Sequence, residues 1–214
     1  MRKKVIVTGG AGFIGSHISE LLVNKGYKVV VIDNFETGRI DNLSRISKNI
    51  TIVKQDVANY QKIEGYFKNC QYVFHLAALA DIVPSIENPE KYYKTNVTGT
   101  LNILRASKKF GIKKVLYAAS ASCYGVVKKF PTDEKNKIIT EYPYALTKNI
   151  GEQLMTHWSK VFKLPTISLR LFNVYGLRSR TTGAYGAMFG VFLAQKINNK
   201  PLTIVGDGKQ TRDF

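Results

Sequence analysis

Four glycines lie in a seven-residue segment, Gly9 to Gly15, that directly follows an apolar run from Val5 to Thr8. The segment GGAGFIG satisfies both Gly-x-x-Gly-x-x-Gly and Gly-x-Gly-x-x-Gly. Glycine at these spacings permits a tight turn, lets a diphosphate approach the backbone, and allows the next helix to pack closely on a sheet. The motif therefore predicts a strand, a glycine turn and a helix at the start of a parallel sheet.

The rest of the chain repeats this alternation of strand and helix. Short β-branched runs are separated by longer segments in which apolar residues have helical spacing. The expected strands cover residues 5–8, 29–33, 51–53, 72–76, 115–119 and 166–171. This alternation is typical of a parallel sheet with crossover helices on both faces. We therefore predict an α/β fold, a Rossmann-like doubly wound parallel sheet.

The first helix is expected to end near Lys25-Gly26, because glycine is a good C-cap. Its predicted buried face consists of Ile14, Ile18, Leu21 and Leu22. No repeat or linker interrupts residues 1–175, which we assign to one domain. Composition changes after Gly176, where a stretch rich in Arg, Gly, Ala and Tyr precedes an expected helix near 188–197. Residues 176–214 are therefore assigned to a second unit.

A helix that starts at the glycine turn favours a phosphate at its N-terminus, because free N–H groups and the helix dipole attract negative charge. Asp33 ends the second expected strand, where a carboxylate accepts hydrogen bonds from ribose hydroxyls and repels a 2′-phosphate. These features predict a dinucleotide site that takes NAD rather than NADP. The cofactor residues expected from this pattern are Gly9, Gly12, Phe13, Ile14, Gly15, Asp33, Asn34, Asp56, Val57, Leu76, Ala77 and Ala78.

Within this set, Asp56 and Val57 follow the third strand and are expected near adenine. Leu76, Ala77 and Ala78 follow the fourth, where small residues leave room for the cofactor backbone. His75 precedes them, and we interpret it as a structural histidine rather than a catalyst.

Two tyrosine–lysine pairs have the four-residue spacing that places both side chains on one helix face: Tyr124/Lys128 and Tyr144/Lys148. A glycine and two valines follow Tyr124 and indicate a loop, whereas the proline before Tyr144 is well placed to open a helix. A lysine ammonium one turn away favours the phenolate, and is expected to lower the pKa of Tyr144. The second pair is therefore the candidate general base.

Lysine and arginine number 32 against 15 acidic residues, which gives a net charge of +17. A nucleic acid would suit such a charge, but the lysines are scattered over nearly every expected helix and turn. A solvated basic surface, or a preference for anionic small substrates, is the better interpretation, and we expect no nucleic-acid partner.

The chain has two cysteines, Cys70 and Cys123, so neither a disulfide framework nor a cysteine metal site is expected, and we predict no bound metal. The apolar run after the basic start breaks after three residues, which argues against a targeting segment. No run approaches membrane-spanning length. We therefore predict a cytoplasmic protein without a membrane partner.

Ser120 leaves the fifth expected strand within the segment AASASCYG, from Ala118 to Gly125, at the same sheet edge as the glycine turn. With this segment in place, the chain resembles the extended short-chain dehydrogenases/reductases, and within them the NAD-dependent nucleotide-sugar epimerase/dehydratase family. The other matching segments are TGG at 8–10, NVTGT at 96–100, the Tyr144/Lys148 pair, FNVYG at 172–176 and RDF at 212–214.

The resemblance implies roles for individual residues. The catalytic residues would be Ser120, Tyr144 and Lys148. Ser122 is the alternative to Ser120, unless it is a strand-end hydroxyl bonded to nearby backbone. The implied substrate-binding residues are Ser120, Ser122, Asn173 and Arg212, and Asn96, Tyr144 and Lys148 join the cofactor set. Without these roles, Asn173 would be a turn residue, Asn96 a helix-kinking side chain and Arg212 a surface arginine.

One departure indicates which branch of the family the chain resembles. Sugar 4,6-dehydratases place an Asp-Glu pair directly after the catalytic threonine, because eliminating water needs an extra acid and base. The uronate decarboxylases carry an acidic residue at the second of these positions. Here the two positions are Ala121 and Ser122. Epimerisation of a UDP-hexose at C4, through a 4-keto sugar, is therefore the favoured reaction.

The segment 206–214 resembles one that lies well inside the family's proteins. We therefore expect an incomplete C-terminal substrate-binding lobe, with NAD binding but poor turnover of UDP-sugars. Helices resembling 88–109 and 143–162 often pair two subunits in the family, which implies a homodimer. A dehydratase or decarboxylase of the same family, and a non-catalytic dinucleotide-binding module, remain alternatives. Retention of Ser120, Tyr144 and Lys148 argues against the module.

Overall fold

The computed structural model describes residues 2–127, 131–179, 188–204, 206–209 and 211 of the chain. Within these residues all six expected strands are confirmed, and some of their ends differ by one or two residues. They are β1 (Lys4–Thr8), β2 (Lys28–Asp33), β3 (Ile50–Lys54), β4 (Cys70–His75), β5 (Lys114–Ser120) and β6 (Thr166–Leu171). None of the helices described by the structure has the length and apolar character needed to span a membrane.

The strands form one parallel sheet in the order β3-β2-β1-β4-β5-β6. From β1 the chain moves outward to β2 and β3, and then returns to place β4 on the other side of β1. In open α/β sheets, ligands bind outside the carboxyl ends of the strands at such a switch point. The predicted Rossmann-like, doubly wound fold is confirmed, and the glycine turn after β1 lies at its switch point.

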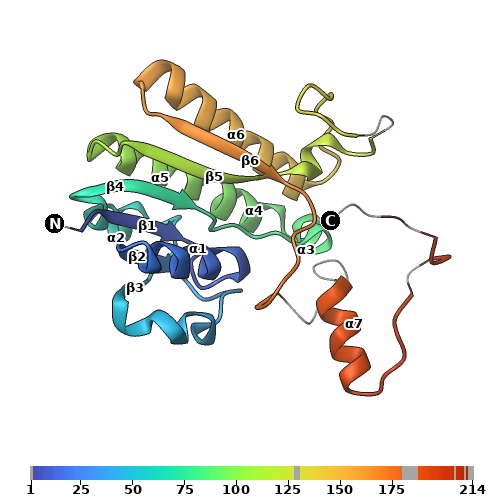
Figure 1. Cartoon of the computed structure of the whole chain (residues 1–214). Coiled ribbons are helices and arrows are strands. Elements are labelled where there is room, and N and C mark those ends of the chain that lie inside the picture. Colours follow the sequence, from blue (N-terminus) through green and yellow to red (C-terminus); the bar gives the residue numbers. More distant parts are fainter. Residues whose placement is uncertain (1, 128–130, 180–187, 205, 210, 212–214) are drawn as a thin grey trace.

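The connections between the strands are mostly helical (Figure 1). The α-helices are α1 (Phe13–Asn24), α2 (Tyr60–Ile63), α3 (Ile82–Glu87), α4 (Pro89–Tyr92), α5 (Gly99–Lys109), α6 (Pro143–Phe162) and α7 (Met188–Ile197). The part of the chain that the structure describes also has three 3-10 helices, η1 (Ile40–Asn49), η2 (Glu64–Phe67) and η4 (Ala121–Tyr124), and a π-helix, η3 (Tyr93–Thr98).

Alternate residues of the strands build a separate hydrophobic core on each face of the sheet. Val5 and Val7 of β1 pack in the cluster that contains Leu22 of α1. Ile6, between them, packs on the opposite face in the cluster that contains Met155 of α6. Burial of both faces explains why the strands are apolar runs rather than alternating apolar and polar residues.

The predicted buried face of α1 is wrong in part. Leu22 is buried, but Leu21 is 54% exposed, and Ile14 and Ile18 are half-buried. The other buried residues of α1 are small: Gly15, Ser16 and Ser19. Small side chains let the helix lie close to the glycine turn and the sheet, so close approach rather than apolar spacing sets the buried face.

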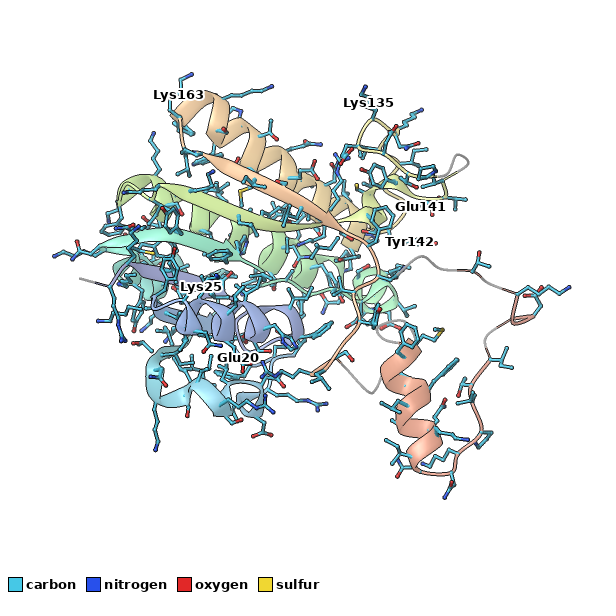
Figure 2. The ribbon with its side chains drawn as sticks, viewed as in Figure 1. Glu20, Lys25, Lys135, Glu141, Tyr142 and Lys163 are labelled. Atoms are coloured by element: carbon cyan, nitrogen blue, oxygen red, sulfur yellow. The ribbon has the colours of Figure 1, made fainter. Side chains whose placement is uncertain are left out.

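Helix α6 begins as the sequence predicts, with Pro143 in its first turn. The backbone N–H of Tyr144 donates to Ser85 Oγ at 3.1 Å, which satisfies one of the free donors at this end. Figure 2 shows Glu141 and Tyr142 near this end of α6, and Lys163 at the other end. The N-terminal turn of α6 therefore brings Tyr144 to the sheet edge that carries the glycine turn.

Helix α7 has the bounds predicted from the sequence, Met188–Ile197. Figure 1 shows it lying apart from the sheet and from the helices that cover the sheet. Several of its apolar side chains are exposed, among them Leu193 at 61% and Ile197 at 70%. Helix α7 therefore covers neither face of the sheet.

Candidate active site

Two glycines of the turn, Gly9 and Gly15, have no room for a side chain. Gly9 has φ +67°, and a Cβ atom there would lie 2.6 Å from the backbone nitrogen of Ala77. A Cβ atom on Gly15 would meet the carbonyl oxygen of Gly9. Gly12 is the N-cap of α1 and makes no side-chain cap, so Phe13 and Ile14 open the helix with N–H groups free to face a phosphate. These features fit the pyrophosphate of a dinucleotide.

A cavity of about 70 Å³ lies beside this turn. Its lining residues are Gly12, Phe13, Thr37, Arg39, Asn42, Arg178 and Ser179. The two arginines put positive charge next to the helix N-terminus, although Arg178 also pairs with Glu20. The sequence prediction missed both arginines, because neither belongs to the glycine motif.

Asp33 supports the glycine turn from the end of β2. Its carboxylate accepts hydrogen bonds from the Ala11 N–H at 2.9 Å and the Phe35 N–H at 2.8 Å. Burial raises the pKa of Asp33, and the two backbone hydrogen bonds act in the opposite direction. The observed role of Asp33 is therefore to support the glycine turn. Each carboxylate oxygen has a second lone pair that a ribose hydroxyl could use, so ribose binding remains a prediction.

Three other predicted cofactor residues lie on loops at the same edge. Asn34 Oδ1 accepts from the Glu36 N–H at 3.1 Å, and Asp56 Oδ1 accepts from the Ala58 N–H at 2.8 Å. The Val57 side chain is only 4% exposed and belongs to the core. An adenine contact through the Val57 side chain is therefore not supported, because packing against α5 occupies it.

Residues 76–78 pass directly beside the glycine turn. Leu76 N–H donates to Thr8 O at 3.1 Å, and Ala77 N–H donates to Thr8 Oγ1 at 3.3 Å. Ala78 is half-buried. The ends of β1 and β4 are thus joined at the switch point, with small side chains where the cofactor is expected to pass.

His75 is structural, as the sequence analysis expected. It is fully buried, with Nδ1 2.7 Å from Thr8 Oγ1 and Nε2 3.0 Å from Thr100 Oγ1. Thr100 Oγ1 donates its own proton to Asn96 O, so it accepts from the ring, which assigns the proton to Nε2. Burial, and more weakly the charge of Lys148, lower the pKa of His75 to about 3.

Ser120 and Tyr144 meet, although they come from different elements. Ser120 ends β5, Tyr144 opens α6, and the Ser120 hydroxyl lies near enough to Tyr144 to act against the rise of its pKa. Ser120 Oγ also accepts from the Ser122 N–H at 3.2 Å and the Ser122 hydroxyl at 2.8 Å. Ser120 is thus left to donate its proton toward Tyr144, and Ser122 acts on Ser120 rather than on nearby carbonyls.

Lys148 lies one turn after Tyr144, as the spacing predicts, but it is directed toward β5. Its Nζ donates to the Ala118 carbonyl oxygen and lies 4.4 Å from the centre of the Tyr117 ring. The side chain is buried, and this burial lowers the pKa of Lys148 to about 7. The Tyr117 ring beneath the ammonium was not part of the predicted site, since nothing in the sequence spacing links β5 to α6.

The predicted lowering of the Tyr144 pKa by Lys148 is wrong for the protein alone. Burial raises the pKa of Tyr144, the hydrogen bond from Ser120 acts to lower it, and the nearby charge of Asp81 acts to raise it. Desolvation disfavours the phenolate just as it disfavours the Lys148 ammonium. Proximity to Lys148 on one helix face therefore does not determine the direction of the Tyr144 pKa shift, because burial acts on both groups.

Asn96 lies within the π-helix η3 and is 1% exposed. Its Oδ1 accepts from the Leu79 N–H at 2.9 Å, and its Nδ2 donates to Leu79 O and to Thr147 Oγ1, each at 3.0 Å. Thr147 lies between Tyr144 and Lys148 on α6. Asn96 thus braces the helix that carries the candidate base, and its position in a π-helix is one often found at functional sites.

The other members of the predicted set lie farther along the chain. Asn173 follows β6 and is exposed. Arg212 lies outside the described residues. The competing tyrosine, Tyr124, ends the short helix η4 and is buried, while Lys128 is also outside the described residues. Among the residues that are described, no group of three or more His, Cys, Asp or Glu side chains could hold a metal ion.

A sheet with this strand order, a glycine turn at its switch point and a Ser-Tyr-Lys group at the same edge define a class of NAD-dependent enzyme. The model of the NAD dependent epimerase/dehydratase family matches residues 5–214. The chain belongs to this family, and the resemblance seen in the sequence is confirmed.

The relatives of this chain are named for different reactions. A putative UDP-glucose 4-epimerase from Methanocaldococcus jannaschii is 36% identical over 98% of this chain and 68% of its own length. A UDP-N-acetyl-alpha-D-glucosaminuronate decarboxylase from Bacillus cytotoxicus is 33% identical over 100% of this chain and 67% of its own. Epimerases and decarboxylases are therefore both similar to this chain.

The solved structure of a UDP-N-acetylglucosamine 4-epimerase from Methanobrevibacter ruminantium M1, in complex with UDP-N-acetylmuramic acid, superposes with a TM-score of 0.95. It is 37% identical, and the match covers 100% of this chain and 68% of that one. The chain thus spans about two thirds of the length of these three proteins.

Proposed function

We propose that the chain epimerises a nucleotide sugar, a UDP-hexose, at C4. The observation that carries this proposal is the neutral turn after Ser120. Ala121 has no acidic group, and Ser122 donates to Ser120 instead of presenting a carboxylate. One base and one hydroxyl suffice for reversible oxidation at C4, whereas elimination of water needs a further acid and base.

Each residue has a defined part in this reaction. Tyr144 removes the proton from the sugar O4 hydroxyl. Ser120, whose lone pairs accept from Ser122, donates its one proton to the phenolate before this transfer and to the sugar oxygen after it. Lys148, whose pKa is lowered to about 7, lies one turn from the base, and Asn96 holds the first turns of α6 through Thr147. The glycine turn and Asp33 would hold NAD, which when bound would supply the hydride acceptor and donor for C4.

A panel of UDP-sugars tests the proposal. The protein is incubated with NAD and UDP-glucose, UDP-N-acetylglucosamine or UDP-glucuronate, and the C4 configuration is read by proton NMR. We expect gluco and galacto forms to interconvert. A pentose product with release of carbon dioxide would show a decarboxylase, and a 6-deoxy-4-keto product a dehydratase. NAD binding without any product would favour the non-catalytic module.

Removal of the base is the first testable prediction. Tyr144→Phe is expected to lower kcat by about 10²- to 10⁴-fold, because the phenol is the general base and its ring is retained. The matched control is Tyr93→Phe, since Tyr93 is 51% exposed on η3 and lies outside the proposed site. Equal activity of Tyr144→Phe and the wild type would contradict the mechanism.

Other assignments belong to the same proposal. Residues 176–214 would begin a substrate-binding lobe, with Asn173 and Arg212 contacting the sugar nucleotide. Exposed apolar side chains on α6, such as Leu146 at 45% and Val161 at 55%, support a homodimer formed through this helix. Cys70 and Cys123 are both free and buried, which suits a reducing cytoplasm.

A further inference from the structure

Arg170 of β6 joins three parts of the molecule. Its Nε donates to Glu152 Oε2 at 3.0 Å and its Nη2 donates to Glu152 Oε1 at 2.6 Å, so the ion pair is bidentate. Its Nη1 donates to the Tyr124 hydroxyl at 2.7 Å. The Arg170 and Glu152 side chains are only 19% and 18% exposed, which sets this pair apart from a solvated surface salt bridge.

The first arm, as we call the ion pair between Arg170 and Glu152, contacts helix α6. Glu152 follows Lys148 by four residues and Tyr144 by eight, so all three occupy the same side of the helix. A planar guanidinium that binds a carboxylate through two parallel hydrogen bonds fixes both its distance and its direction. The ion pair therefore ties β6 to the side of α6 that carries Tyr144 and Lys148.

The second arm, the hydrogen bond from Arg170 to the Tyr124 hydroxyl, contacts the turn that follows Ser120. Tyr124 is the last residue of η4, is 4% exposed, and lies with its ring 4.9 Å from the Arg170 guanidinium carbon. Ser122, in the middle of the same turn, holds Ser120 through its N–H and hydroxyl. Arg170 thus contacts the end of the same turn whose middle residue, Ser122, donates to Ser120.

We propose that Arg170 is a positioning residue that holds Ser120 and Tyr144 in one relative position, by fixing the rotation of α6 and the turn after β5. It holds the turn after β5 and the helix α6 at one separation, from a strand adjacent to both. Its catalytic consequence rests on the proposed function, in which Tyr144 is the base. Errors of about 1 Å in such a geometry reduce rates by about 10²-fold.

Three variants separate the arms. Arg170→Met removes both arms and keeps an apolar stem, Glu152→Gln removes the charge of the first arm, and Tyr124→Phe removes only the hydroxyl of the second. Tyr124→Phe loses one oxygen atom and so tests the idea even where Arg170→Met does not fold. Lys109→Met is the matched control, because it breaks the 2.5 Å ion pair with Glu64, which joins α5 to η2.

The first measurement is the ¹³Cζ resonance of Tyr144 at pH 7 in tyrosine-labelled protein. Tyr144→Phe assigns the signal, and Ser120→Ala gives its position when the Ser120 hydroxyl is absent. We expect the three variants to move the signal toward the Ser120→Ala position and Lys109→Met to leave it unchanged. A signal at the wild-type position in all three folded variants would overturn the proposal.

The second measurement is steady-state kinetics with the sugar nucleotide that the wild type turns over. A positioning role predicts a fall in kcat of about 10- to 100-fold, with KM and NAD affinity nearly unchanged. Unchanged kcat in the three variants would defeat the role of Arg170 and leave the proposed function intact. Absence of any wild-type product, with the NMR signal moving as expected, would defeat the proposed function and leave the positioning role intact.

Discussion

Burial determines the ionisation of the side chains around Tyr144. The pKa of Tyr144 is raised, that of Lys148 is lowered to about 7, and that of His75 is lowered to about 3, in each case mainly through desolvation. The hydrogen bond from Ser120 opposes this effect at Tyr144. The strength of Tyr144 as a base therefore depends on the few polar contacts that reach it.

His75 gives a prediction for stability against pH. Its pKa is about 3 in the folded protein and 6.5 when unperturbed, so between these values the unfolded chain binds a proton that the folded chain does not. The stability that depends on neutral His75 is complete above pH 6.5 and is lost as the pH falls toward 3, by about 1.4 kcal/mol per pH unit. Urea unfolding of the wild type between pH 7 and 4 measures it.

His75→Gln is the matched variant, because an amide can donate and accept but does not titrate in this range. We expect the free energy of unfolding of the wild type to fall more steeply with decreasing pH than that of the variant. Parallel curves for the two proteins would contradict the assignment of a neutral, buried histidine.

At the scale of the elements, the glycine turn and α1 depend on close backbone contact. Gly15→Ala would place a Cβ atom against the Gly9 carbonyl oxygen and 2.8 Å from Gly10 Cα, so the turn must open. Overpacking of this kind costs about 1–3 kcal/mol, and we expect NAD affinity to fall by about 10- to 100-fold.

Isothermal titration with NAD measures this loss. Gly65→Ala is the control, since a Cβ atom on Gly65 meets nothing within 4 Å. If Gly15→Ala bound NAD as tightly as Gly65→Ala, the turn would not be the pyrophosphate site.

The buried face of α1 gives a second prediction at this scale. Leu22→Ala is expected to lower the free energy of unfolding by about 2–5 kcal/mol, because Leu22 is 7% exposed in the core. Leu21→Ala, at 54% exposure, is expected to change it by less than about 0.5 kcal/mol. Denaturant unfolding of both variants measures the difference. Similar losses in the free energy of unfolding would show that Leu21 is buried as well, as the sequence predicted.

At the scale of the whole molecule, assembly gives the last prediction. Leu146→Glu places a charge on an exposed apolar position of α6, and we expect it to convert a dimer to monomers in sedimentation velocity. Leu21→Glu is the control, because Leu21 is also exposed but lies on α1. A monomeric wild type, or a dimer that survives Leu146→Glu, would contradict assembly through α6.

Features encoded within a few neighbouring residues could be predicted without coordinates. The six strands followed from β-branched runs, the turn from Gly9 to Gly15 followed from its spacing, and the start of α6 followed from Pro143. Each depends on local sterics and on apolar periodicity, which the sequence states directly. The class of fold and the family followed from these features together.

Properties that depend on contacts between distant segments could not be predicted in this way. The direction of the Tyr144 pKa shift depends on how deeply α6 is buried, and Lys148 is directed to Ala118 on β5 because of the packing of that helix on the sheet. The closeness of Ser120 to Tyr144, and the hydrogen bonds of Arg170 to Tyr124 and Glu152, likewise involve residues far apart in the chain. Desolvation and side-chain direction arise from packing, so the sequence located the groups while the folded structure set their chemistry.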